Sequence, residues 1–83
     1  MKIDKKELFK IVSKSLQVKL SKIKIDTKSE DLEEWDSLGQ LAIISALDKK
    51  FKGKVNFSKI STSVKIKDIF NFLKKNSLIK ENV

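Results

Sequence analysis

The sequence lacks the side chains on which most self-contained enzymes and metal sites depend. Its 83 residues include no cysteine, histidine, tyrosine or proline. Without cysteine and histidine the chain cannot form a Ser-His-Asp triad, a cysteine nucleophile, a disulfide or an ordinary zinc site. Because only lysines, carboxylates and hydroxyls remain for catalysis, we expect a protein that is not an enzyme and holds no metal.

Arginine is also absent, since all 19 basic residues are lysine. Arginine grips phosphate and guanine through two parallel hydrogen bonds, so its absence disfavours specific nucleic-acid recognition. The longest unbroken apolar run is Leu41–Ile44, whereas a membrane-spanning helix needs about 20 residues. The charged N-terminus has no apolar stretch behind it, unlike a signal peptide. We therefore expect a cytoplasmic protein that binds neither a membrane nor nucleic acid.

Glycine is scarce as well, occurring only at Gly39 and Gly53. Few turn-forming residues favour helices over a turn-rich β fold. A chain of this length supports one small core. We therefore expect one monomeric domain over residues 1–83, with frayed ends at 1–3 and 77–83.

The net charge of +8 is unevenly distributed. Residues 1–25 carry +6, residues 26–48 carry −6 and residues 49–83 carry +8, so a basic protein contains one acidic segment. The lysine excess has two interpretations, a solvated surface or a footprint for nucleic acid or anionic lipid. The second lacks support, because no aromatic residues alternate with the lysines and no nucleic-acid-binding motif occurs.

Hydrophobic periodicity predicts an all-α fold, a small bundle of three longer helices and one short helix. The first helix runs from about Asp4 to residue 18 or 20, the second covers 37–51, and the last ends near Asn76. A single turn of helix is expected between residues 55 and 63. The apolar positions that define these helices are Leu8, Val12, Leu16 and Leu20; Leu38, Leu41, Ile43, Ile44, Leu47 and Phe51; Phe57 and Ile60; and Ile66, Ile69, Phe70 and Leu73.

Residues 21–35 show no sustained period and are expected to form a long loop between the first two helices. Ile23, Ile25 and Leu32 would pin this loop to the core. A loop of this length in a compact domain is more often functional than accidental.

The start of the second helix carries clear boundary signals. Asp36 and Ser37 are both good N-cap residues, and Ser37 with Gln40 fits a capping box. Lysines close the helix before Gly53, as the helix dipole and a C-terminal cap favour.

This segment resembles the modification-site helix of acyl carrier proteins. Residues 32–51 read LEEWDSLGQLAIISALDKKF. Members of that family carry Asp-Ser-Leu at the start of their second helix, followed by an apolar helix ending in Leu-Glu-x-x-Phe. The order and lengths of the expected helices and loop are also similar over the whole chain. The resemblance implies a carrier of acyl or aminoacyl groups, held as thioesters on a covalent 4'-phosphopantetheine arm.

By this resemblance, Ser37 receives the arm through a phosphodiester on its hydroxyl. A helix N-terminus suits the phosphate, and a chain without cysteine would obtain its only thiol from the arm. Gly39 would leave the modified serine unobstructed. The simpler alternative is that Ser37 is only an N-cap and Gly39 a tolerated defect.

The resemblance also implies partners, namely a phosphopantetheinyl transferase and an acyl or aminoacyl ligase or synthase. In the family these enzymes dock on the exposed face of the second helix, which usually carries acids. Here Gly39, Ala42 and Lys49 stand where acids are common, which puts pairing with housekeeping fatty-acid enzymes in doubt. The sequence of residues 35–41 is more similar to that of carriers from dedicated lipid, polyketide or saccharide-linked pathways. The expected docking residues are Asp36, Leu38, Leu41, Ala42, Ser45, Asp48 and Lys49.

The sequence leaves open the role of the inner helix faces and two alternatives to the carrier function. The inner faces of the helices could shelter an acyl chain, or could simply be core. The chain could instead be a basic helical interaction module without a prosthetic group, binding an acidic protein or nucleic acid. It could also be an inactive carrier-like scaffold, although an intact Asp-Ser-Leu argues against that. The candidate acyl-lining residues are Ile43, Ile44, Leu47, Phe51, Ile60 and Ile66.

Overall fold

Three α-helices and three short 3-10 turns form the fold. The structure, a computed structural model, describes residues 2–80. This confirms the expectation of a small all-α bundle, since the described part of the chain has two isolated β-bridges and no strand. The segment expected to form a short fourth helix is a 3-10 turn. The α-helices are α1 (Lys5–Leu16), α2 (Ser37–Lys50) and α3 (Ile66–Lys75), and the 3-10 turns are Leu20–Lys22, Ser29–Asp31 and Phe57–Ile60.

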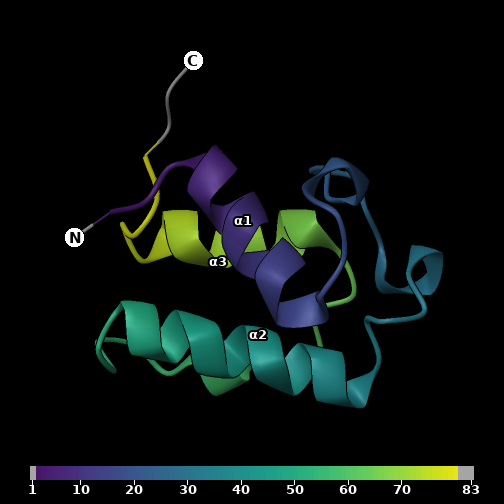
Figure 1. Cartoon of the computed structure of the whole chain (residues 1–83). Coiled ribbons are helices and arrows are strands. Elements are labelled where there is room, and N and C mark those ends of the chain that lie inside the picture. The colour runs from purple at the N-terminus through teal and green to yellow at the C-terminus, as the bar shows by residue number, and fades with distance from the viewer. Residues whose placement is uncertain (1, 81–83) are drawn as a thin grey trace.

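The helices pack around one core to which all three α-helices, the 3-10 turn Phe57–Ile60 and parts of the connections contribute. α1 lies against α2, α3 lies behind α1 in this view, and the connection from α1 to α2 extends out beyond both helices (Figure 1). The buried apolar side chains are Ile3, Leu8, Val12, Leu16, Ile23, Leu32, Trp35, Ile43, Leu47, Phe51, Phe57, Ile60, Ile66, Ile69, Leu73, Leu78 and Ile79.

The first helix begins where the sequence predicts and ends earlier. The Asp4 carboxylate accepts a hydrogen bond from the Glu7 N–H at 2.8 Å and so caps the helix. Gln17 adopts a left-handed conformation with φ of 58°, which turns the chain after Leu16. The predicted extension to residue 18 or 20 is therefore wrong, and Leu20 lies outside the helix and is 40% exposed.

The second helix begins at Ser37, and its cap is Asp36. The Asp36 carboxylate accepts a hydrogen bond from the Gly39 N–H at 2.9 Å. The capping box predicted between Ser37 and Gln40 does not form, because Ser37 is already the first helical residue and Gln40 has other partners. Beyond the helix, Lys52 and Gly53 both take left-handed conformations, as expected for a glycine-assisted end.

The connection between α1 and α2 is ordered by its own hydrogen bonds. Ile23 and Leu32 are buried and Ile25 is half-buried, which confirms the predicted anchoring of this loop. The Thr27 hydroxyl accepts a hydrogen bond from the Lys24 N–H at 2.8 Å. The Thr27 carbonyl accepts another from the Ile66 N–H at 3.0 Å, so the loop is tied to the start of α3.

The two ends of the described chain, which fall in the ranges where the sequence predicts fraying (1–3 and 77–83), lie side by side. Ile3 and Ile79 form a parallel bridge, and both side chains are buried. The Ile3 N–H donates to the Leu78 carbonyl at 3.0 Å, and the Lys80 N–H donates to the Ile3 carbonyl at 2.7 Å. These contacts close one end of the core. Residues 1 and 81–83 lie outside the described residues.

Candidate functional site

Ser37 presents a free hydroxyl at the start of α2. Its side chain is exposed, and the neighbouring Asp36 caps the helix in its place. Among residues 2–80, no side chain or backbone group forms a hydrogen bond with the Ser37 hydroxyl. The simple N-cap interpretation of Ser37 is therefore wrong. The hydroxyl is free to react or to be modified.

An open depression of about 270 Å³ lies beside Ser37. Three segments meet there: the loop before α2, the first turn of α2, and the residues that lead into α3. Hydroxyl groups are common on its walls, so the depression offers hydrogen bonds to a polar chain lying in it. The lining residues are Ser29, Trp35, Asp36, Ser37, Gln40, Ser61, Thr62, Ser63 and Val64.

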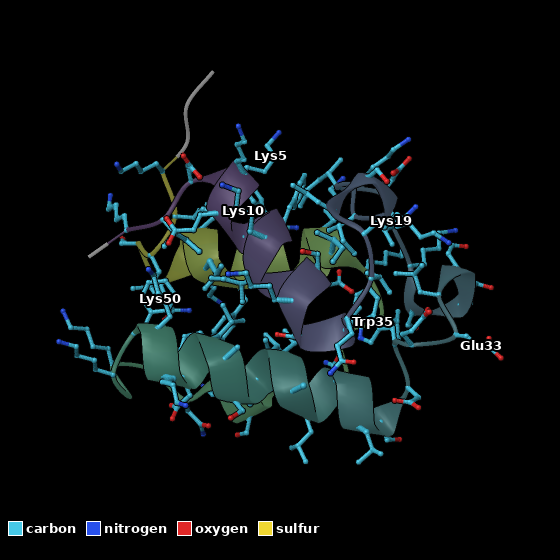
Figure 2. All side chains as sticks on the ribbon, viewed as in Figure 1. Lys5, Lys10, Lys19, Glu33, Trp35 and Lys50 are labelled. Carbon is cyan, nitrogen blue, oxygen red and sulfur yellow. The ribbon has the colours of Figure 1, made fainter. Side chains whose placement is uncertain are left out.

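A hydrogen-bonded pair of side chains fixes the walls of this depression. The Gln40 side-chain oxygen accepts a hydrogen bond from the Trp35 Nε1–H, and its side-chain nitrogen donates to the Ile60 carbonyl. Trp35 is only 5% exposed and points in toward the bundle, whereas Glu33 points out from the loop (Figure 2). Gln40 thus ties the loop and the 3-10 turn to α2. The signal in the sequence is Trp35 itself, because a buried indole N–H needs an acceptor; Gln40 supplies that acceptor and does not form the predicted capping box.

Gly39 has a different role from the expected one. It is buried, and an added Cβ would collide with the Glu34 carbonyl oxygen and come within 2.7 Å of Leu16 Cδ2. The missing side chain therefore lets the loop backbone and α1 pack against the first turn of α2. Gly39 is therefore not a tolerated defect, because it lets the loop that leads to Ser37 pack against α2.

The seven expected docking residues lie on the accessible side of α2. Leu38 and Leu41 are 76% and 61% exposed, so two large apolar side chains face solvent close to Ser37. α2 is therefore apolar on its outer face near Ser37 as well as on its inner face at Ile43 and Leu47. Asp36, Leu38, Leu41, Ser45, Asp48 and Lys49 are exposed, and Ala42 is half-buried.

The six candidate acyl-lining residues are part of the packed core. Five of them are no more than 2% exposed, and Ile44 is half-buried. They contact other core side chains, so the structure assigns them a packing role. The five buried residues are Ile43, Leu47, Phe51, Ile60 and Ile66.

Residues 2–80 bring together no group of three or more side chains able to hold a metal ion. No helix in this range is long and apolar enough to cross a membrane.

Comparisons of the chain with protein-family models, curated proteins and solved structures found no match. The interpretation of the site therefore rests on its own geometry and on the Asp36-Ser37-Leu38 motif.

Replacing Ser37 by alanine is expected to change the free energy of unfolding by less than about 0.5 kcal/mol, because the substitution removes no hydrogen bond from the fold. Asp36→Ala is the matched control and should cost about 0.5–2 kcal/mol, since it removes the cap. Urea denaturation followed by circular dichroism measures both. A loss above 1 kcal/mol for Ser37→Ala would show that the serine is structural.

Proposed function

We propose that the chain is an acyl carrier protein that carries acyl or aminoacyl groups as thioesters on 4'-phosphopantetheine attached to Ser37. Its pathway would be a dedicated lipid, polyketide or saccharide-linked one. The observation that carries the proposal is the Asp36-Ser37-Leu38 motif at the start of α2, with Asp36 capping the helix and the Ser37 hydroxyl exposed and unpaired. The order of elements, with a long loop before α2 and a 3-10 turn before α3, supports an acyl-carrier-like fold.

The residues around Ser37 fit a phosphodiester and a polar arm. The first turn of α2 offers N–H groups and the positive end of the helix dipole, both of which favour a phosphate. The hydroxyl-lined depression beside Ser37 would contact the amide groups of the arm. When attached, the arm supplies the thiol that this cysteine-free chain lacks. The protein itself performs no chemistry; it presents Ser37 and the docking face.

Partner enzymes would contact the exposed apolar residues next to Ser37. Leu38 and Leu41 flank the serine along α2 and leave their side chains open to solvent. Burying exposed apolar side chains against a partner is favourable, so these two leucines are expected to be the main contacts. The transferase and the ligase or synthase would share them.

The proposal is tested by modification of the apo protein. Incubation with coenzyme A and a broad-specificity phosphopantetheinyl transferase should raise the intact mass by one phosphopantetheine. Ser37→Ala should abolish the increase, whereas Ser21→Ala, which alters an exposed serine outside α2 and its docking face, should retain it. No increase in the wild type, or an increase that survives in Ser37→Ala, contradicts the proposal.

The second candidate function is a basic interaction module without a prosthetic group. It is favoured by the lysines that point outward from α1 and from the connection after it, including Lys5, Lys10 and Lys19 (Figure 2). Such a module would bind heparin or DNA with an affinity that falls as salt rises. That affinity would be the same in Ser37→Ala, and the transferase would leave the wild type unmodified.

A further inference from the structure

An open groove of about 630 Å³ runs between α1 and α2, on a different side of α2 from the depression beside Ser37. Its floor is apolar or small, and lysines stand at its rim. The lining residues are Ile11, Lys14 and Ser15 from α1, and Ala42, Ser45, Ala46, Lys49 and Lys50 from α2.

The groove exists because the facing side chains are short. Ala42 and Ala46 lie one turn apart on α2, opposite Ile11 and Ser15 of α1, and all four are only half-buried. The Ser15 hydroxyl donates to the Ile11 carbonyl of its own helix at 2.8 Å. The hydroxyl on the groove floor is therefore already hydrogen-bonded, and the floor can accept an apolar side chain from a partner protein.

The rim carries positive charge that the fold does not neutralise. Lys50 pairs with Glu7 across α1 and α2, with Nζ and Oε2 2.7 Å apart. Lys14 and Lys49 are exposed and form no ion pair with any residue of the described chain. Two cations thus flank an apolar floor, a combination that attracts a partner carrying both carboxylates and apolar side chains.

The groove is continuous with the exposed leucine beside Ser37. Leu38, Ala42, Ser45 and Lys49 follow one another at i, i+4, i+7 and i+11, so they lie on one face of α2. This face is about 16 Å long at 1.5 Å per residue, which matches about three turns of a partner helix. It begins with an apolar residue at the Ser37 end and finishes with Lys49.

We propose that this groove docks an acidic amphipathic helix of a partner protein. Apolar side chains of that helix would enter between Ala42, Ala46 and Ile11, and its carboxylates would meet Lys14 and Lys49. Charge complementarity selects this occupant, because a basic helix would place like charges at the rim and an uncharged acyl chain would leave both lysines unused. The inference rests on the proposed carrier function and deepens it by naming the chemistry of the partner.

The experiment uses the apo protein and two synthetic 16-residue helical peptides. Both peptides place leucines at i, i+4 and i+7 on one face; the first has glutamates beside them and the second has lysines. We expect the acidic peptide to bind with a dissociation constant of about 10–100 μM, near −6 kcal/mol, and the basic peptide to bind at least tenfold more weakly. Amide chemical-shift changes should concentrate on residues 11–15 and 38–50.

Matched double variants test the contribution of the rim lysines. Lys14→Glu/Lys49→Glu should weaken the binding of the acidic peptide at least tenfold. Lys59→Glu/Lys67→Glu alters net charge equally at exposed lysines outside the groove and should change the affinity by less than threefold. All four positions are exposed lysines, so both variants are expected to keep the fold.

Several outcomes overturn the inference. They are no saturable binding of the acidic peptide, equal binding of the two peptides, equal weakening by both double variants, or shift changes outside the groove. Because the peptide titration does not require Ser37, repeating it with Ser37→Ala separates this inference from the carrier proposal. If the transferase does not modify the wild type and the wild type still binds the acidic peptide, only the carrier proposal is contradicted.

Discussion

Leu47→Ala is expected to lower the free energy of unfolding by about 2–5 kcal/mol. Leu47 is fully buried in the inner face of α2, within the core shared by all three helices. Truncation removes apolar burial and leaves a cavity that rigid helices fill only in part. A chain of 83 residues has about 4–12 kcal/mol of stability in total. The variant therefore loses a large fraction of its stability.

Leu41→Ala is the matched control, because it makes the same chemical change in the same helix at a side chain that is 61% exposed. It should cost less than about 0.5 kcal/mol. Urea denaturation followed by circular dichroism measures the stability of both variants. If Leu47→Ala is already unfolded without urea, Leu47→Met replaces it in the comparison. That substitution is expected to cost less than about 1.5 kcal/mol. A larger loss for Leu41→Ala than for Leu47→Ala would mean that α2 faces the opposite way, and equal losses would contradict the difference in burial between the two leucines.

The three α-helices could be predicted because their signals are local. Leu8, Val12 and Leu16 recur at the helical period, and the structure buries all three. Asp4 is a good cap residue directly before them and does cap α1. A pattern within one turn or two therefore suffices to locate a helix, whereas its exact end depends on the rest of the chain.

The failures have a common cause, which is contact between residues far apart in sequence. Nothing near Gln17 shows that α1 ends there, since it is a non-glycine residue in a left-handed conformation. Ile3 and Ile79 stand outside any periodic segment, so only the folded chain reveals their pairing. The prediction of frayed ends treated each end separately and could not include this pairing.

The same distinction between local and long-range signals applies to the candidate site. Ser37 could be singled out because Asp-Ser-Leu is a local motif at a helix start. The hydroxyl-lined depression and the α1–α2 groove could not, because each is assembled from segments more than 20 residues apart in sequence, such as Lys14 and Lys49. Gln40 illustrates the difference: a local rule predicts a capping box, but the side chain bonds instead to Ile60.

Gly39→Ala is expected to lower the free energy of unfolding by about 1–3 kcal/mol, although alanine is the better helix former by about 1 kcal/mol. The new Cβ would collide with the Glu34 carbonyl oxygen, a backbone atom that cannot rotate away. The loop must therefore move from α2. That movement would disturb Trp35, whose indole N–H donates to the Gln40 side chain.

Trp35 provides the measurement, because it is the only tryptophan and is 5% exposed. Its fluorescence emission should shift to longer wavelength in folded Gly39→Ala as water reaches the indole. Gly53→Ala is the control: its φ of 71° costs alanine about 1–2 kcal/mol, but the added Cβ has nothing within 4 Å. Gly53→Ala should therefore lose stability with an unchanged emission maximum. A Gly39→Ala protein with wild-type stability and emission would show that the loop adapts to the added methyl, and that Gly39 does not set the approach to Ser37.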